Sequence, residues 1–200
     1  MREIIAVDAD EVLCSEVDAI IAFSKERIGL NLTYDDFKKP GDYWGYYERL
    51  WGDTGEDPYT LFKEFLTSSH KANQSILRED VAILEKLKSR YQLEIVTSRT
   101  AEFVDITNQM LGKYAADIFA DVHFVSLWSD SDRKVTKAHI CKEIGAGYLI
   151  DDSPEHCNLA AEVGVKALLF GDWGWSRGKE LHPGVERVAD WKEVAEYFGV

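Results

Sequence analysis

The chain is poor in cysteine and in long apolar runs, and each shortage excludes a class of protein. Its three cysteines form neither a CxxC pair nor a Cys/His cluster, which argues against a disulfide framework and against a zinc site. No run approaches the roughly 18 apolar residues that a membrane-spanning helix needs. The N-terminus opens on a strand-like segment and shows no secretory pattern. We therefore expect a cytoplasmic protein with no membrane partner.

Positive charge is scarce as well. The 23 Lys and Arg residues are outnumbered by 36 Asp and Glu residues, so the formal net charge is −13. Proteins that bind the nucleic-acid backbone usually present a basic face, and no nucleic acid polymer is expected as a partner. A small anionic substrate remains compatible with this charge if cations or a metal ion lie at its site.

The most informative stretch lies near the N-terminus. Residues 4–7 form a short apolar run that is typical of a strand buried on both faces, and this run leads directly into Asp8 and Asp10. Carboxylates two positions apart on a strand point to the same side and repel each other unless a cation lies between them. Mg²⁺ is the cation that suits this site, and solvated aspartates in a turn are the simpler alternative.

Helical and strand patterns alternate along the rest of the chain. Apolar runs at 93–96, 122–125, 148–150 and 165–170 predict four further strands, and a helix over 132–144 carries Lys134 and Lys137. This alternation predicts an α/β fold with a parallel sheet flanked by helices. The segment from 15 to 77 differs, because it lacks a strand pattern and is rich in aromatic residues.

Polar residues gather where the predicted strands end. They are Asp8 and Asp10, then Thr97, Ser98 and Arg99, then the two lysines before the fourth strand, and finally Asp151 and Asp152. In a parallel sheet the carboxyl ends of the strands lie along one edge, where α/β folds bind ligands. Carboxylates, a hydroxyl and an ammonium group together suit phosphoryl transfer, which needs Mg²⁺ ligands, a nucleophile and groups that neutralise phosphate oxygens.

The order of these residues separates two classes of protein. A bacterial receiver domain has an acidic pair, then the phosphorylated Asp, then Thr and Lys, whereas here the order is Asp-x-Asp, Thr, Lys, Asp-Asp. With Asp8-Ala9-Asp10-Glu11-Val12-Leu13 at its start, this order resembles the haloacid dehalogenase (HAD) superfamily of phosphohydrolases over residues 4–152. The resemblance implies a HAD-like (Rossmann-like) core at 1–14 and 78–200, with a small helical cap at 15–77 inserted after the first strand.

The resemblance also implies catalytic roles. Asp8 would be the nucleophile that becomes an aspartyl-phosphate, and Asp10 would be the general acid and later the general base. Thr97, with Ser98, would hydrogen-bond the phosphoryl oxygens. Lys137 would neutralise phosphate charge, and it is preferred to its rival Lys134 because it opens the helix that leads to the fourth strand.

The same resemblance implies a Mg²⁺ site. The ion would be bound by Asp8, by the backbone carbonyl of Asp10 and by the later acidic pair, with Asp152 as the direct ligand and Asp151 in support. Glu11 departs from the family, which most often has Gly at this position. It adds negative charge near the phosphate and leaves the leaving-group preference open.

A finer resemblance concerns the substrate. Residues 168–177 and 187–191 look like the tail of the deoxyribonucleotidase-type 5′-nucleotidases, which stack a nucleobase on aromatic cap residues. Trp44 and Tyr47 would form such a platform, or else belong to the core of the helical segment. Arg99 and Arg177 would contact substrate phosphate or pair with carboxylates, and Arg99 is included among the predicted substrate-binding residues.

The expected function is therefore a Mg²⁺-dependent phosphomonoesterase that acts on a small phosphorylated substrate, a nucleoside 5′-monophosphate. Two alternatives stay open. One is a phosphatase for a non-nucleotide metabolite, and the other is a non-catalytic binding module that keeps the HAD fold.

Overall fold

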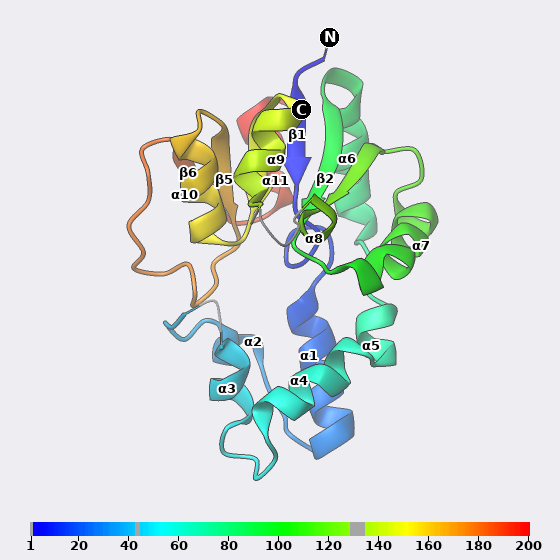
Figure 1. Ribbon diagram of the computed structural model, residues 1–200, viewed down its shortest axis with the longest axis vertical. Coiled ribbons are helices and arrows are strands. Elements are labelled where there is room, and N and C mark those ends of the chain that lie inside the picture. Colours follow the sequence, from blue (N-terminus) through cyan, green and yellow to red (C-terminus); the bar gives the residue numbers. More distant parts are fainter. Residues whose placement is uncertain (1, 43–44, 129–134) are drawn as a thin grey trace. The chain divides into compact units, whose positions relative to one another are not determined.

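The computed structural model describes residues 2–42, 45–128 and 135–200 (Figure 1). The chain divides into two compact units. Unit 1 comprises Met1–Cys14, Ser75–Gly171 and Glu180–Val200, and unit 2 comprises Ser15–Gln74 and Asp172–Lys179. The sequence prediction had placed 172–179 with the core, whereas the structure groups this segment with the helices of unit 2.

Unit 1 is built on a six-stranded parallel sheet in the order β3-β2-β1-β4-β5-β6. Its strands are β1 (Ile4–Val7), β2 (Gln92–Thr97), β3 (Phe119–Phe124), β4 (Ala146–Asp151), β5 (Lys166–Phe170) and β6 (Val185–Val188). The predicted α/β fold with a parallel, helix-flanked sheet is confirmed. The chain runs outward from β1 to β3 and then returns to β4 on the other side of β1, which makes the β1/β4 pair the topological switch point.

Helices cover both faces of this sheet. They are α6 (Arg78–Arg90), the 3₁₀ turn η1 (Ala101–Phe103), α7 (Val104–Tyr114), α8 (Val125–Trp128), α9 (Lys137–Ile144), α10 (Pro154–Glu162) and α11 (Trp191–Phe198). Successive residues of β1 point to opposite faces, as strand geometry requires. Ile5 and Val7 pack in the cluster that holds residues of α6, α7 and α11, whereas Ala6 packs in the cluster that holds residues of α9 and α10. The central strand is therefore buried on both faces.

Three elements differ from the sequence prediction. The strand β6 was not predicted, because its two central residues, Glu186 and Arg187, are charged and exposed and interrupt the apolar pattern. The strand β3 begins at Phe119, three residues earlier than the apolar run suggested. The helix α9 begins at Lys137, because Thr136 has an extended backbone and its side chain accepts a hydrogen bond from the His139 N–H, as an N-cap does. The predicted helix start at 132 lies outside the described residues.

Unit 2 is helical, with α1 (Glu16–Ile28), α2 (Tyr34–Phe37), α3 (Tyr46–Trp51), α4 (Pro58–Leu66) and α5 (Ser69–Ala72). The ends of its longer helices follow the sequence signals. Ser15 caps α1 through the Asp18 N–H, and Gly29, with φ 68°, ends that helix in the left-handed conformation. Asp57 caps α4, whose first residue is Pro58.

Large aromatic side chains form the core of unit 2. Trp51 is fully buried, packs edge-on against Phe23 and donates its indole N–H to Ser24 Oγ at 2.9 Å. Trp175, from the later segment of unit 2, belongs to the same cluster. Gly174 lets this segment approach closely, because a Cβ there would lie 1.9 Å from the Lys39 carbonyl oxygen.

None of the helices that the structure describes has the length and apolar character of a membrane span.

Candidate active site at the carboxyl edge of the sheet

The site begins where β1 and β4 end side by side. Val7 pairs with Ile150 in the parallel ladder, and the Asp8 N–H continues it by donating to the Ile150 carbonyl at 3.0 Å. Asp8 therefore follows the end of β1 directly, while Asp151 is the last residue of β4. The ladder thus brings two carboxylates that are 143 positions apart in the chain (151 − 8) to neighbouring places on the sheet edge.

Lys137 lies between these two carboxylates. Because Thr136 caps α9, Lys137 occupies the first position of that helix. Its Nζ lies 2.7 Å from Asp8 Oδ2 and 2.7 Å from Asp151 Oδ2, and its side chain is about 1% exposed. The rival lysine, Lys134, lies outside the described residues.

The electrostatics follow from burial and from this pairing. Burial raises the pKa of Asp8 to about 6, although the ammonium of Lys137 opposes the shift. Burial also disfavours the ionised form of Asp151, but Lys137 and then His156 outweigh it and hold the pKa of Asp151 below its ordinary value. Burial alone would lower the pKa of Lys137, and its two carboxylate partners raise it instead. At neutral pH the site therefore holds a charged lysine and an ionised Asp151.

Asp152 adds a third buried carboxylate. Oxygen atoms of Asp8, Asp151 and Asp152 all lie within 4.8 Å of one another. Burial raises the pKa of Asp152 well above its ordinary value, and the charges of Asp151, Asp8 and Glu11 add to the shift. Hard divalent cations prefer such oxygen ligands. A bound cation would also offset the repulsion among the three carboxylates, which the single positive charge of Lys137 does not balance. The donor set therefore fits Mg²⁺.

Asp10 lies in the loop that follows β1, and its carboxylate is held by Arg99. The Arg99 Nε donates to Asp10 Oδ2 at 2.9 Å, and one terminal nitrogen of the guanidinium donates to Asp10 Oδ1 at 2.7 Å. Both oxygens of Asp10 are thus engaged by one planar group. This bidentate pair brings together two of the residues that the sequence analysis had assigned to acid–base chemistry and to substrate binding.

The loop that carries Asp8 and Asp10 turns back on itself. The Glu11 N–H donates to the Cys14 carbonyl at 2.8 Å, and the Cys14 N–H donates to the Ala9 carbonyl at 3.1 Å. Glu11 has φ 58°, a left-handed conformation that glycine adopts without strain and that costs other residues about 1 kcal/mol or more. The backbone of this turn therefore suits the Gly that the HAD pattern most often has at this position.

The hydroxyl residues after β2 lie in different environments. Thr97 is buried at the end of β2, and its Oγ1 accepts a hydrogen bond from the Arg99 N–H at 3.2 Å. Ser98 is exposed. Their proposed contacts with phosphoryl oxygens stay predictions.

The predicted aromatic platform belongs to unit 2. Tyr47 is half-buried, and its ring stacks on that of Phe62 with the centroids 4.6 Å apart. Trp44 lies outside the described residues. Arg177 also belongs to unit 2, where its Nε donates to Asp172 Oδ1 at 2.8 Å and one of its terminal nitrogens donates to the Lys38 carbonyl. A role for Tyr47 in substrate binding stays a prediction.

The sequence analysis missed one member of the site. It assigned no role to His156, whose Nδ1 lies 3.2 Å from Asp151 Oδ1. A signal was present, because Ser153 and Pro154 mark the start of α10 and therefore place His156 in its first turn, close behind the acidic pair.

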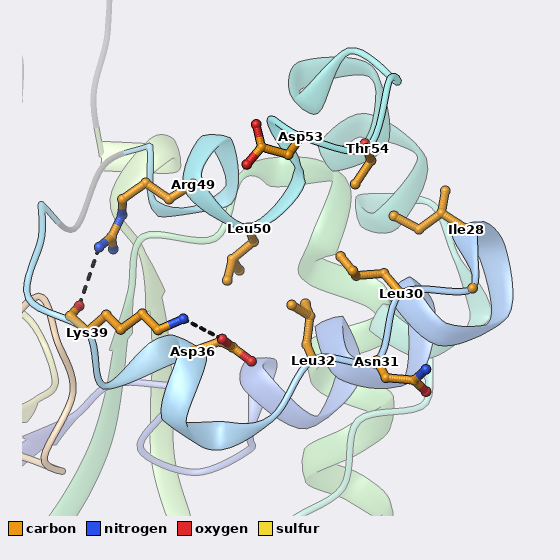
Figure 2. A pocket seen from close by; sticks show the side chains of 11 residues that line it. Ile28, Leu30, Asn31, Leu32, Asp36, Lys39, Arg49, Leu50, Asp53 and Thr54 are labelled. Carbon is orange, nitrogen blue, oxygen red and sulfur yellow. Dashed lines mark hydrogen bonds and ion pairs between the residues drawn. The ribbon is translucent and has the colours of Figure 1, made fainter.

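Unit 2 contains a separate pocket of about 520 Å³ (Figure 2). Apolar side chains such as Leu32 and Leu50 lie beside polar groups that pair with one another. Lys39 Nζ is 2.7 Å from Asp36 Oδ1, and Arg49 donates to the Lys39 carbonyl at 3.3 Å. None of the predicted catalytic or metal-binding residues lines this pocket. The predicted catalytic and metal-binding residues therefore lie apart from this pocket, in unit 1.

Comparison with known proteins identifies the fold. No protein-family profile and no curated protein sequence matches the chain. Among solved structures, it superposes on a hydrolase of the haloacid dehalogenase-like family from Streptococcus pneumoniae with a TM-score of 0.64, at 16% identity and over 98% of each chain. The chain has the haloacid dehalogenase-like fold.

Two further structures with this HAD-like fold hold different bound groups. One is the L-2-haloacid dehalogenase of Xanthobacter autotrophicus with chloropropionic acid covalently bound, with a TM-score of 0.63, 11% identity and coverage of 100% of this chain and 99% of that one. The other is YfnB of Bacillus subtilis, a protein assigned to the HAD hydrolases and bound to magnesium, with a TM-score of 0.63, 12% identity and the same coverage. At these identities the likeness concerns the fold.

Proposed function

We propose that the protein is a Mg²⁺-dependent phosphomonoesterase with Asp8 as its nucleophile. One observation carries the proposal: three buried carboxylates have oxygen atoms within 4.8 Å of one another, and a single buried ammonium pairs with two of them. The nucleophile, its cationic partner and the acidic pair all lie at the switch point of the sheet. HAD-like hydrolases with the same fold, one of them bound to magnesium, add support.

The first half of the reaction transfers the phosphoryl group to Asp8. A carboxylate oxygen of Asp8 forms a bond to phosphorus while the bond from phosphorus to the ester oxygen breaks, and Asp10 gives its proton to the departing oxygen. Lys137 keeps Asp8 in place and offsets phosphate charge, and Thr97 with Ser98 hydrogen-bonds the phosphoryl oxygens.

The second half hydrolyses the aspartyl-phosphate. The oxygen of a water molecule forms a bond to phosphorus, the bond between phosphorus and the Asp8 oxygen breaks, and the water proton passes to Asp10. Inorganic phosphate leaves and Asp8 is regenerated. Asp8, the Asp10 backbone carbonyl and Asp152 would hold Mg²⁺, with Asp151 in support, and the ion when bound neutralises developing phosphate charge.

We propose a nucleoside 5′-monophosphate as substrate and unit 2 as the cap that recognises the leaving group. The aromatic side chains of unit 2 support this assignment, because large rings can stack on a planar base. The competing assignment is a phosphorylated metabolite without a base, for which these rings serve only as the core of unit 2. We further propose that the protein acts in the cytoplasm on this small substrate, without a nucleic acid polymer or a membrane as partner.

Dehalogenation is the rival activity, because several proteins with this fold are haloacid dehalogenases. A halide leaves without a proton and without a metal ion, so it has no use for Asp10 as an acid. The cluster of three carboxylates that includes the nucleophile would also repel the carboxylate of a haloacid. The phosphate ester with Mg²⁺ fits this charge distribution better.

The test is phosphate release from a panel of nucleoside monophosphates, sugar phosphates and an aryl phosphate, with Mg²⁺ and with a chelator, for wild type and Asp8→Asn. Release from nucleotides that needs both Mg²⁺ and Asp8 supports the whole proposal. Phosphate release only from esters other than nucleotides would support the proposed mechanism and reject a nucleoside monophosphate as the substrate. Chloride release from 2-chloropropionate without phosphate release would reject the phosphatase, and stable phosphorylation without turnover would favour a receiver-like or binding role.

A further inference from the structure

The pocket of unit 2 carries a further inference, which does not depend on the proposed function. Its volume of about 520 Å³ falls within the range of roughly 300–1,000 Å³ that is usual for small-molecule sites. All of its lining residues lie between positions 28 and 54, so unit 2 alone builds it (Figure 2). The groups that we propose for catalysis belong to unit 1. The pocket is therefore a candidate binding site of its own.

One part of the pocket is apolar. The side chains of Leu30, Leu32 and Leu50 point toward one another across it, and Ile28 lines it as well (Figure 2). All four side chains are half-buried and pack against the aromatic core of unit 2. Aliphatic surface of this kind favours a ligand that can remove its own apolar group from water. The pocket therefore suits a ligand with an apolar side chain.

Arg49 occupies a fixed place in the polar part of the pocket. One of its terminal nitrogens donates to the carbonyls of Lys39 at 3.3 Å and Pro40 at 3.0 Å. Gly41 makes room for the guanidinium, because a Cβ there would lie 2.2 Å from that same nitrogen. A guanidinium has five N–H groups, and the Nε and the other terminal nitrogen of Arg49 donate to no residue that the structure describes. These N–H groups are available to a ligand.

Asp53 supplies the opposite charge, four positions after Arg49. Gly52 keeps a helical backbone between them, so the two side chains have the one-turn spacing at which an ion pair can form. The guanidinium is held at the carbonyls of Lys39 and Pro40 instead. Within the part of the chain that the structure describes, Asp53 has no hydrogen-bond or ion-pair partner for its side chain. The pocket therefore keeps a positive and a negative charge apart.

Two neighbouring carboxylates are already neutralised. Asp36 Oδ1 lies 2.7 Å from Lys39 Nζ, and both residues line the pocket. Asp42 Oδ1 lies 2.9 Å from Lys179 Nζ. A ligand in the pocket therefore meets one cation and one anion that lack a charged partner, beside an apolar wall.

We propose that this pocket binds a free α-amino acid with an apolar side chain, in its zwitterionic form. The ligand carboxylate accepts hydrogen bonds from Arg49, the ligand ammonium donates to Asp53, and the side chain packs among the three leucines. An aliphatic acid would bring a second negative charge to Asp53, and an aliphatic amine would leave Arg49 without an acceptor. A zwitterion also has no net charge, so the net charge of −13 does not repel it as it would repel an anion.

The test is isothermal titration calorimetry of the whole chain with leucine and with phenylalanine. Three partial ligands each lack one feature of leucine: glycine lacks the apolar side chain, 4-methylpentanoate lacks the ammonium, and 3-methylbutylamine lacks the carboxylate. Each should bind about tenfold or more weakly than leucine, because each leaves part of the pocket unmatched. In ¹H–¹⁵N NMR spectra, leucine should change the amide shifts of residues 28–32 and 49–54 most.

Two substitutions identify the charged contacts. Arg49→Met should weaken leucine binding about tenfold or more and leave 3-methylbutylamine unaffected, because that ligand has no carboxylate. Asp53→Asn should weaken leucine binding by a similar factor and should not weaken 4-methylpentanoate, which has no ammonium. The matched controls are Arg78→Met and Asp35→Asn, at exposed positions outside the pocket, and both should bind leucine as wild type does. If a pocket variant does not fold, the partial ligands decide the matter on wild-type protein.

The other outcomes overturn the assignment. Wild-type protein that binds neither leucine nor phenylalanine at about 10 mM has no amino-acid site of useful affinity. Binding of 4-methylpentanoate or 3-methylbutylamine as tight as that of leucine would reject the zwitterion, and equal leucine binding by Arg49→Met and Arg78→Met would reject the contact with Arg49. Shift changes centred outside the pocket would reject its location. None of these measurements uses phosphate release, so failure of the proposed function would leave this proposal standing.

Discussion

The ammonium of Lys137 lies 2.7 Å from Asp8 Oδ2, and the same nitrogen lies 2.7 Å from Asp151 Oδ2. One cation thus balances two buried carboxylates that end neighbouring strands. The pairing ties the stability of unit 1 to the groups that we propose for catalysis.

Lys137→Met should destabilise the protein by about 3 kcal/mol or more, because two carboxylates would stay buried without their cation. The matched control is Lys142→Met, which changes an exposed lysine of the same helix and should cost less than about 1 kcal/mol. Urea denaturation of both variants gives the comparison. Equal losses for the two substitutions would show that the buried ion pairs contribute little.

Asp152→Asn should separate two effects of the acidic cluster: the loss of stability that it causes without metal, and its ability to bind Mg²⁺. Without metal the variant should melt at a higher temperature than wild type at neutral pH, because burial and the neighbouring charges disfavour an ionised Asp152. Added Mg²⁺ should stabilise wild type by about 2.7 kcal/mol when its concentration is 100 times the dissociation constant, and the melting temperature should rise accordingly. The melting temperature of the variant should hardly change.

Asp105→Asn, at an exposed position of α7, is the control for that experiment and should respond to Mg²⁺ as wild type does. If Mg²⁺ does not change the melting temperature of wild type, the three carboxylates do not form a metal site.

Asp80 should make the stability of the protein depend on pH away from the site. Burial raises its pKa to about 6, and the charges of Glu79 and Asp190 add to the shift. Because folding favours the protonated form, this contribution is full below the unfolded pKa of about 4 and is lost as the pH rises through about 6. Asp80→Asn should remove this slope and stabilise the protein above pH 6 by about 1 kcal/mol, allowing for solvent screening of a half-buried group.

The measurement is the free energy of unfolding in urea between pH 4 and pH 8. Glu85→Gln, at an exposed position of the same helix, should leave the pH dependence as it is in wild type. A slope that survives in Asp80→Asn would assign the pH dependence to other carboxylates.

Trp191 should support the loop that carries Asp8 and Asp10. Its indole N–H donates to the Val12 carbonyl at 2.9 Å, and the side chain is buried. Trp191→Phe leaves this carbonyl without its donor and should cost about 1–3 kcal/mol of stability, with a several-fold loss of phosphatase kcat as the loop loosens.

Trp51→Phe is the matched control, because Trp51 is also buried and also donates its indole N–H, to Ser24 in the core of unit 2. It should cost a similar amount of stability and spare kcat. If both variants lose kcat in proportion to stability, the hydrogen bond from Trp191 has no particular effect on the site.

Much of this architecture follows from local patterns. The run at residues 4–7 predicts a central strand, and Ser15, Asp57 and Asp190 mark helix starts where the structure has them. These signals act over one or two turns of chain, so a sequence displays them directly. β6 was not predicted because a four-residue edge strand with two exposed charged residues has no such pattern. It pairs with β5 only after the intervening segment between Phe170 and Val185 has brought the chain back to the sheet.

The gathering of Asp8, Asp10, Thr97 and the later acidic pair at one edge of the sheet could be expected from the order of residues along the chain, because parallel strands must end on one edge of the sheet. The partners of each group depended on tertiary structure. Lys137 between Asp8 and Asp151, the Arg99 fork on Asp10 and His156 beside Asp151 join residues from separate elements. The order of residues along the chain predicts which groups lie at the edge of the sheet. Which donor pairs with which carboxylate depends on tertiary packing, because a difference of a few tenths of an ångström decides whether a hydrogen bond forms.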